Sequence, residues 1–326
     1  MHRFLRLTST FIILLLLSAA SKAQTSTFSK LVVFGDSISD TGNLALFDLP
    51  PPFFENRISN GLVSVDLIAQ SIGSNADRSG HLLGQQDGGF NYAVSGGNVV
   101  GSDPEDLTSQ VSAFLNRVNQ QADRNALYVV IIGGNDLRDI RSIIDPVTAN
   151  SAIITVITQL DSQLRRLSNA GARAFVIANV ANIGRIPETL NLSAQDPSIA
   201  IRAEQYVRQY NTALSPLLDE FAQTPELAVV EFDLFQALED VLNNADSLGF
   251  SNSQEGCFNA SDFSVELECL LLGFDSRVFF DNIHPSALTH RLISPLIIAE
   301  IPDLPQEIIP REPFFITPIL PLLLED

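Results

Sequence analysis

Short apolar runs rich in β-branched and aromatic residues alternate with longer amphipathic segments along most of this chain. We expect strands at six of the apolar runs, namely residues 31–34, 89–94, 127–132, 174–178, 228–232 and 278–280. We expect helices between and after them, at residues 61–72, 106–121, 152–170, 199–221, 234–244 and 285–301. A strand followed by a helix, repeated along a chain, favours a mainly parallel sheet covered by helices on both faces. The sequence therefore predicts an α/β fold, built as a three-layer α/β/α sandwich with a mainly parallel central sheet.

Length and composition favour one large domain. A chain of 326 residues, 45% of them hydrophobic, can bury one large core or two small ones. No internal repeat is visible, and we predict a single domain over residues 24–307. The formal net charge of −19 makes nucleic acid and anionic membrane surfaces poor partners.

The N-terminus has the pattern of a secretory signal peptide, which we assign to residues 1–23. Arg3 and Arg6 supply a positive start, residues 11–17 an apolar centre, and residues 21–23 a small-x-small cleavage site. A membrane anchor is the alternative, but the apolar run is too short to cross a bilayer core of about 30 Å. We therefore predict secretion, to the periplasm or the extracellular medium.

The C-terminus is apolar but interrupted by prolines. Residues 308–326 contain four prolines among phenylalanine, isoleucine and leucine residues. Prolines at this density forbid an ordinary membrane-spanning helix. We predict a tail that packs on the domain or is mobile in solution, and no stable membrane insertion.

The sequence contains two cysteines, Cys257 and Cys269. Both lie in the part of the chain that we expect to be exported, and their separation suits a local disulfide that closes a loop. Two free buried thiols are the alternative. A pair of cysteines without nearby histidines is weak evidence for zinc. A disulfide here would stiffen the loop at residues 243–276, which could form one wall of a site.

The most informative stretch is residues 32–43. An apolar run ends abruptly at Gly35, and Ser37 follows between the carboxylates of Asp36 and Asp40. Loops at the carboxyl ends of parallel strands are where α/β folds place reactive groups, and a serine becomes a nucleophile when a positioned base removes its proton. Ser37 is therefore the candidate nucleophile. A simple strand-to-helix turn, in which Ser37 or Asp40 caps the next segment, is the alternative.

Three histidines are candidates for the base. We interpret both His81 and His290 as solvent-facing. His81 lies in a polar, glycine-containing stretch with no carboxylate at a suggestive spacing, and His290 lies in the middle of a predicted helix. His284 directly follows an apolar strand and precedes Pro285, which suits the first turn of a helix. Asp281, three residues earlier, can fold back to accept the Nδ1 proton and leave Nε2 facing the nucleophile.

Two other strand ends could donate hydrogen bonds to an oxyanion. Residues 91–97 offer backbone N–H groups in a glycine turn, and Asn135 offers an amide side chain just beyond the apolar run that ends at Ile132. Each of these alone is more often an ordinary turn than a site. Four such strand ends in one chain favour a site.

Four blocks in these strand ends resemble the GDSL lipase/esterase family of SGNH hydrolases, in the order in which that family has them. The blocks are Gly-Asp-Ser-Ile-Ser-Asp at 35–40, Ser-Gly at 95–96, Gly-Gly-Asn-Asp at 133–136 and Asp-Asn-Ile-His at 281–284. Residues 57–61 and 182–187 also resemble segments of the secreted lecithinase/hemolysin-like and plant branches. The resemblance implies a flavodoxin-like SGNH hydrolase fold.

The same resemblance implies a catalytic triad and an oxyanion hole. The triad would be Ser37 as nucleophile, His284 as base and acid, and Asp281 as the group that orients the histidine. The oxyanion hole would be the backbone of Ser37, Gly96 and the side chain of Asn135. A shift of one residue in the glycine block would place Gly97 there instead.

The function predicted from the residues and the resemblance is a secreted hydrolase of carboxylic acyl esters, on lipids or small molecules. This mechanism needs no metal and no organic cofactor. The alternatives are an acyltransferase that uses the same acyl-enzyme, a polysaccharide acetylesterase, and a non-catalytic surface-binding protein. An apolar, proline-stiffened loop at residues 46–54 lies close to Ser37 in sequence and favours acyl chains, although it could equally pack on the core. The sequence makes no prediction of oligomeric state.

Overall fold

The computed structural model describes residues 28–44, 48–85 and 87–304. The predicted signal peptide and the predicted C-terminal tail therefore lie outside the described residues. Four parallel strands form the central sheet in the order β1-β2-β3-β4. They are β1 (Leu31–Gly35), β2 (Leu127–Ile131), β3 (Ala174–Ala178) and β4 (Ala228–Phe232). Strands β1 to β3 are buried along their whole length, because helices cover both faces of the sheet.

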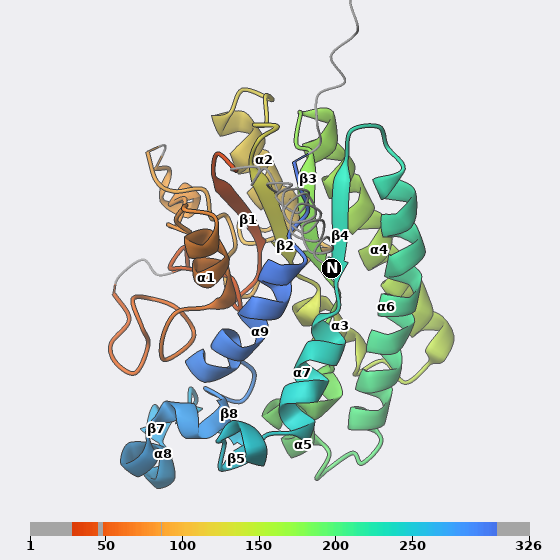
Figure 1. Cartoon of the computed structure of the whole chain (residues 1–326). Coiled ribbons are helices and arrows are strands. Elements are labelled where there is room, and N and C mark those ends of the chain that lie inside the picture. Colours follow the sequence, from red (N-terminus) through yellow and green to blue (C-terminus); the bar gives the residue numbers. More distant parts are fainter. Residues whose placement is uncertain (1–27, 45–47, 86, 305–326) are drawn as a thin grey trace, which may run out of the picture.

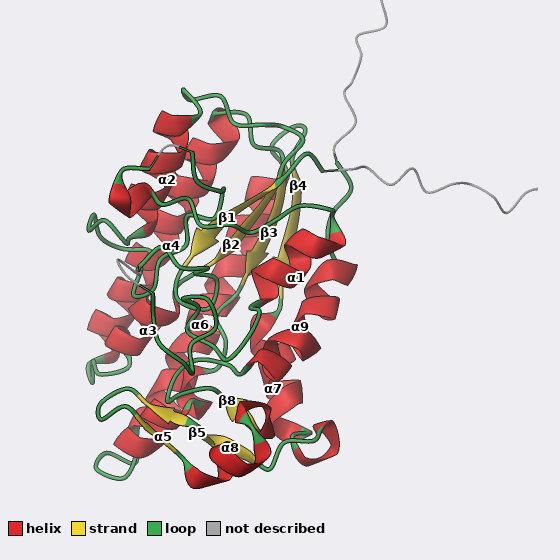
Figure 2. Ribbon diagram, turned by 90° about the vertical axis from the view of Figure 1, so that its left-hand side faces the viewer, coloured by secondary structure: helices red, strands yellow, loops and turns green. Residues whose placement is uncertain are grey.

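Two groups of helices cover the sheet (Figures 1 and 2). On one face lie α2 (Leu107–Arg117), α4 (Pro146–Asn169) and α6 (Ile199–Ala222), and α4 packs against both of the others. On the other face, α9 (Ala287–Ala299) packs between α1 (Ser64–Ser71) and α7 (Leu234–Asn243). The predicted three-layer α/β/α sandwich is confirmed.

Shorter helices lie in the connections. The α-helices are α3 (Gly134–Ile140), α5 (Pro187–Leu192) and α8 (Leu267–Leu272), and the 3₁₀ helices are η1 (His81–Leu83), η2 (Ile183–Arg185), η3 (Asp246–Leu248) and η4 (Phe274–Ser276). Helix α3 begins directly after β2 and is the one that carries the predicted oxyanion donor, Asn135.

The prediction of a strand at residues 89–94 is wrong, because the structure has no regular strand there. This segment runs beside β1 and exchanges backbone hydrogen bonds with Val33 and Gly35, but it forms no regular strand. The side chain of Asn91 explains the difference. Its amide donates to Ser39 O at 2.7 Å, and its oxygen accepts from Ala93 N at 2.9 Å. Such local side-chain bonds compete with a regular ladder.

The last predicted strand does not join the central sheet. Strand β8 (Arg277–Phe279) pairs in parallel with β5 (Asn252–Gly256), and β6 (Phe258–Asn259) pairs with β7 (Ser264–Val265) in a small antiparallel hairpin. Figure 1 shows β5, β7, β8 and α8 together beyond the end of the sandwich where α3 and α5 lie. We call residues 251–276 the stapled lobe.

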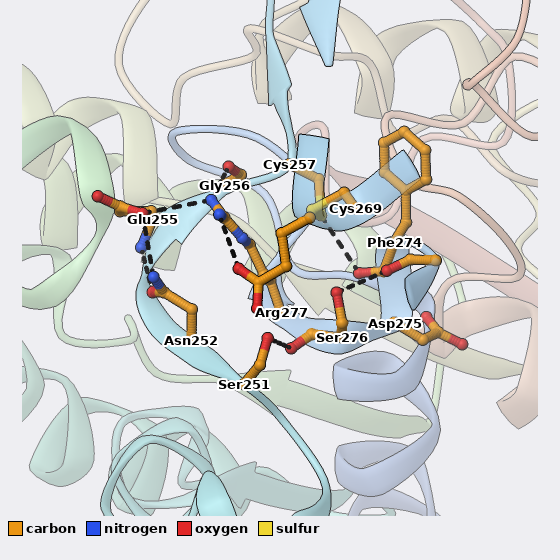
Figure 3. The surroundings of a disulfide bond; sticks show 12 residues. Ser251, Asn252, Glu255, Gly256, Cys257, Cys269, Phe274, Asp275, Ser276 and Arg277 are labelled. Carbon is orange, nitrogen blue, oxygen red and sulfur yellow. Dashed lines mark hydrogen bonds and ion pairs between the residues drawn. A yellow bond between two sulfur atoms is a disulfide. The ribbon is translucent and has the colours of Figure 1, made fainter. Parts of the chain in front are cut away.

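A disulfide between Cys257 and Cys269 holds the stapled lobe together, as predicted (Figure 3). Both cysteines are buried. Arg277 lies beside them, with its guanidinium donating to Gly256 O at 2.7 Å and pairing with Glu268 at 3.2 Å. The lobe is thus closed by one covalent bond and one buried cation.

Candidate active site

Ser37 lies in a tight turn at the carboxyl end of β1. The turn is closed by Ser39 N, which donates to Asp36 O at 3.1 Å, and Asp36 N reaches back to Ile131 O at 3.3 Å. Position 35 must be glycine here, because a Cβ atom on Gly35 would lie 2.5 Å from Ile131 O. This close approach of two strand ends brings Ser37 to the edge of the sheet, where it is 8% exposed.

The structure brings Ser37 into contact with His284, which lies near the other end of the chain. His284 Nε2 is 2.7 Å from Ser37 Oγ. On the far side of the ring, His284 Nδ1 is 2.8 Å from Asp281 Oδ2 and 2.9 Å from Oδ1. A hydroxyl, an imidazole and a carboxylate thus form one hydrogen-bonded line, which is the arrangement that activates a serine.

The turn at residues 281–284 orients the carboxylate. Asp281 Oδ1 accepts the N–H of Ile283 at 2.8 Å and the N–H of His284 at 2.7 Å, and Phe280 N donates to His284 O at 2.8 Å. Burial alone would raise the pKa of Asp281, but the neighbouring His284 and these hydrogen bonds outweigh it and lower the pKa below its ordinary value. Asp281 is therefore ionised when it faces the imidazole at neutral pH.

The amide of Asn135 is fixed from both sides. Its nitrogen donates to Gly97 O at 2.9 Å, and its oxygen accepts from Arg138 Nη1 at 2.9 Å. Arg138 in turn pairs with Glu188 at 2.7 Å. The second N–H of the Asn135 amide has no acceptor among the described residues. Sequence reasoning missed Arg138, although its place one helical turn after Asn135 was a usable signal.

The two candidate glycines differ in their backbone. Gly97 donates its N–H to Val94 O at 3.0 Å. Gly96 has φ of +87°, and no atom lies within 4 Å of the place where its Cβ would be. Within residues 28–44, 48–85 and 87–304, neither the N–H of Gly96 nor that of Ser37 has an acceptor. This geometry favours Gly96 over Gly97 as an oxyanion donor.

Asp40 ties the serine turn to the glycine turn. One carboxylate oxygen accepts the N–H groups of Gly42 and Asn43, and the other accepts Ser95 N at 2.8 Å and Ser95 Oγ at 3.1 Å. The sequence suggested only a capping role for Asp40. Its contact with Ser95 shows that it also positions the residue that precedes Gly96.

Two buried carboxylates lie behind these turns. Burial raises the pKa of Asp36 to about 6, against an opposing hydrogen bond from Ile38 N, and it raises the pKa of Asp136 to about 6 as well. Asp136 accepts the backbone N–H of Val99 at 2.8 Å and that of Val100 at 3.0 Å. These carboxylates fix loops and take no part in the contact between Ser37 and His284.

A mostly apolar cavity opens beside Ser37. It lies between the ends of β2, β3 and β4 and the helices α7 and α9, and it is open to solvent. Its lining includes Ser37, Asn135, Ala181, Leu238 and Ile293. A cavity of this character, next to a polar line of side chains, suits an apolar group attached to a polar reacting centre.

Neither loop proposed as a wall lines this cavity. The described part of the 46–54 loop instead packs against the stapled lobe, with the Phe53 ring centroid 5.1 Å from that of Phe258 and 5.5 Å from that of Phe280. Phe280 directly precedes Asp281. These two loops therefore support the segment that carries Asp281 and His284.

The interpretation of the two other histidines as solvent-facing is wrong. His290 is 4% exposed, and its Nδ1 accepts from Ser64 N at 3.2 Å and contacts Ser64 Oγ at 3.0 Å. Burial, together with the nearby His284, lowers the pKa of His290 to about 3. His81 is half-buried, with Nδ1 2.7 Å from Ser79 Oγ, and burial lowers its pKa. His290 lies on the buried face of α9, at i, i+3 and i+7 spacing with Ala287, Ile293 and Ile297, and this spacing was a usable signal.

Two features are absent from the residues that the structure describes. Among them, no group of three or more His, Cys, Asp or Glu side chains could hold a metal ion. No helix of that part of the chain has the length and the apolar character needed to cross a membrane.

Two solved structures align with most of this chain at low sequence identity. An acetylxylan esterase from Geobacillus stearothermophilus is 16% identical with a TM-score of 0.44, and covers 83% of this chain and 93% of its own. A lipolytic protein of the G-D-S-L family from Veillonella parvula is 14% identical with a TM-score of 0.38, and covers 83% of this chain and 96% of its own.

Sequence comparison identifies the family. A GDSL esterase/lipase of Arabidopsis thaliana is 24% identical over 318 residues, which cover 80% of this chain and 81% of that protein. Lipase 1 of Photorhabdus luminescens is 30% identical over 180 residues, which cover 54% of this chain and 26% of that protein. The family model described as GDSL-like lipase/acylhydrolase matches residues 31–297. The chain therefore belongs to the GDSL-like lipase/acylhydrolase family, and it is an enzyme that hydrolyses carboxylic esters.

Proposed function

We propose that this enzyme is a secreted serine hydrolase that cleaves acyl esters through Ser37, His284 and Asp281. One observation carries the proposal, the 2.7 Å contact between Ser37 Oγ and His284 Nε2 on a ring whose Nδ1 faces a buried carboxylate. The acyl chain would enter the apolar cavity beside Ser37. The mechanism uses side chains and backbone alone.

The first half of the reaction acylates Ser37. His284 Nε2 removes the hydroxyl proton while Ser37 Oγ attacks the ester carbonyl carbon, and Asp281 stabilises the imidazolium. The carbonyl oxygen, now negative, accepts hydrogen bonds from the N–H groups of Ser37 and Gly96 and from the Asn135 amide. Each such donor contributes about 3 to 4 kcal/mol. The C–O bond to the alcohol then breaks, and the imidazolium gives its proton to the leaving oxygen.

The second half releases the acid. Water gives a proton to His284 Nε2 and attacks the acyl carbon of the ester on Ser37, with the same donors around the oxyanion. Collapse of this intermediate breaks the bond to Ser37 Oγ, which regains its proton from the imidazolium. An acyltransferase would differ only in replacing the water by an acceptor alcohol.

The cavity favours longer acyl groups over acetyl. An acetyl group would leave most of the apolar lining without a partner, whereas each methylene buried there contributes about 0.8 kcal/mol. We therefore favour a lipase or acyl esterase over a polysaccharide acetylesterase. The full line of Ser37, His284 and Asp281, with unused N–H donors nearby, weighs against a non-catalytic binding protein.

The test is hydrolysis of p-nitrophenyl esters from acetyl to palmitoyl. We expect kcat/KM to rise beyond acetyl, and the Ser37→Ala variant to lose turnover while its circular dichroism is unchanged. Ser39→Ala is the matched control, because Ser39 lies in the same turn and its Oγ has no partner among the described residues. Equal turnover of Ser37→Ala and the parent enzyme would overturn the assignment. A rate that rises with added alcohol, with ester as the product, would favour the transferase.

The secretion that we propose rests on the N-terminal pattern and on the disulfide, which is typical of exported proteins. Its test is the mass of the protein recovered outside the cytoplasm. The mass should match a chain that begins at Gln24. Recovery of the uncleaved chain in the cytoplasm would contradict export.

A further inference from the structure

Five large apolar side chains stand exposed on the stapled lobe. Their exposed fractions are 72% for Phe263, 69% for Leu267, 65% for Leu270, 75% for Leu271 and 64% for Leu272. We call these five residues the leucine patch. Single exposed leucines are common, but a contiguous apolar patch on an otherwise polar surface marks an interaction site.

The disulfide explains how so short a helix presents this patch. Cys269 is 1% exposed and is bonded to the buried Cys257, so this side of α8 faces inward. Leu267, Leu270 and Leu271 follow the i, i+3, i+4 spacing and share the opposite side of the helix. The disulfide, drawn in Figure 3, thus fixes the inner side of α8, and the leucines remain exposed.

The stapled lobe is attached to the segment that carries the candidate catalytic residues. Cys257 N and Phe258 N both donate to Phe280 O, at 3.0 and 2.8 Å. Phe280 directly precedes Asp281. The path from the leucine patch to Asp281 therefore runs through one disulfide and two backbone hydrogen bonds, which makes the patch a fixed neighbour of the active-site end of the sandwich (Figure 1).

The charge of the stapled lobe limits the kinds of surface that the leucine patch can contact. The stapled lobe contains no lysine, arginine or histidine, and it contains five acidic residues, namely Glu255, Asp262, Glu266, Glu268 and Asp275. Arg277 pairs with Glu255 and Glu268, and Arg291 pairs with Asp275. Among the described residues, Asp262 and Glu266 have no ion-pair partner, so the lobe keeps a negative charge. Anionic lipid surfaces would be repelled. A second copy would also be repelled, because each chain has a formal net charge of −19 and a twofold contact brings the unpaired carboxylates of both lobes together. A surface without net charge, such as one of zwitterionic choline headgroups, is compatible with both the carboxylates and the leucines.

We propose that the leucine patch docks this enzyme on lipid aggregates that carry no net charge. Docking would place acyl esters in the aggregate next to the cavity beside Ser37, and in this respect it rests on the proposed function. The leucines enter the apolar layer, and the carboxylates stay among the headgroups.

Binding to phosphatidylcholine vesicles tests the proposal. The Ser37→Ala chain is used so that no lipid is consumed, and bound protein is measured after sedimentation of the vesicles. Adding Leu270→Ser and Leu271→Ser should lower the partition coefficient about tenfold or more. The matched control is Ile144→Ser with Val147→Ser, two side chains 78% and 75% exposed on another part of the surface. This control should change partitioning less than about twofold.

A second measurement separates docking from chemistry. For this measurement the leucine double variant and the control double variant are made in the chain that retains Ser37. Both should hydrolyse a soluble short-chain ester at the parent rate. Only the leucine double variant should lose activity on an ester presented in phosphatidylcholine vesicles. Absence of vesicle binding, equal binding by the leucine variant, or a dimer that the leucine variant abolishes would each overturn the docking proposal. A parent chain that does not hydrolyse the soluble ester would instead overturn the proposed function.

Discussion

The carboxylate of Asp281 has two roles. It accepts a hydrogen bond from the ring of the proposed base His284, and its Oδ1 also accepts backbone N–H groups of the same turn. Replacing it by asparagine keeps the oxygen that accepts the N–H groups of Ile283 and His284. The amide of the new side chain either places an N–H group opposite His284 Nδ1 or forces the imidazole into the tautomer with its proton on Nε2. The turn keeps its geometry, but His284 can no longer accept the proton of Ser37. We expect Asp281→Asn to lower kcat on a soluble ester by about 10⁴-fold.

Steady-state kinetics and circular dichroism check this expectation together. The control is Asp262→Asn, a change of the same chemistry on an exposed aspartate, and it should leave kcat unaltered. A decrease of less than tenfold in folded Asp281→Asn would show that His284 does not need this carboxylate.

Asp36 should make the stability of the fold depend on pH. Burial raises its pKa from 3.8 to about 6, so the folded chain holds a proton that the unfolded chain has already lost. The stability due to this proton is fully present below pH 3.8 and is lost as the pH rises through 6. Asp36→Asn removes the titration. Relative to the variant, the parent chain should lose about 2 kcal/mol of unfolding free energy between pH 4 and pH 7.

Urea unfolding at the two pH values measures this difference. Asp139→Asn is the control, because Asp139 is exposed on α3. A difference between parent and Asp36→Asn that stays constant with pH would contradict the raised pKa.

At this scale the sequence predicted the members of the site better than their surroundings. Ser37, Asp281, His284, Gly96 and Asn135 stand in short blocks with a recognisable chemistry. Arg138 contacts Asn135 and lies outside these blocks. Asp40 is the last residue of the first block, but the sequence suggested only a capping role for it. His290 was misread because a single sequence gives the spacing of α9 and not the depth of its burial.

The elements follow their patterns where the pattern is strong. All four strands of the central sheet were predicted to within one residue at each end, because uninterrupted apolar runs fit a strand buried on both faces. The segment at 89–94 is apolar except at Asn91, and the side chain of Asn91 takes over the local hydrogen bonding. The sequence gives no sign that β8 pairs with β5, because partner choice depends on tertiary packing.

The stapled lobe allows a prediction for one element. The disulfide closes a loop with a sequence separation of 12 residues, which limits the freedom of the unfolded chain. Replacing Cys257 and Cys269 by alanine should lower the free energy of unfolding by about 3 kcal/mol. Because the lobe binds Phe280, hydrolysis should also weaken before global unfolding as temperature rises.

Urea unfolding and a temperature series of ester hydrolysis provide the measurements. A reducing agent should reproduce the stability loss in the parent chain and leave the double alanine variant unchanged. An equal stability of parent and double variant would mean that the staple adds nothing to the fold.

The whole molecule brings together the two ends of the described chain. Ser37 follows the first strand of the sheet and His284 precedes the last helix, and the sandwich places them 2.7 Å apart. The resemblance to known hydrolases made this meeting predictable. The cavity between the sheet and helices α7 and α9 was not predictable, because it is made by side chains from many segments whose packing no pattern reveals.

Covalent labelling of Ser37 tests the central proposal most directly. An aryl dialkyl phosphate transfers its phosphoryl group to an activated serine and releases the phenol. We predict one label per chain, located on Ser37 by peptide mass spectrometry, with loss of ester hydrolysis in proportion to labelling and no label on Ser37→Ala. An enzyme that takes up no label and keeps its full ester hydrolysis after treatment would contradict the account. Inactivation with the label on a residue other than Ser37 would contradict it as well.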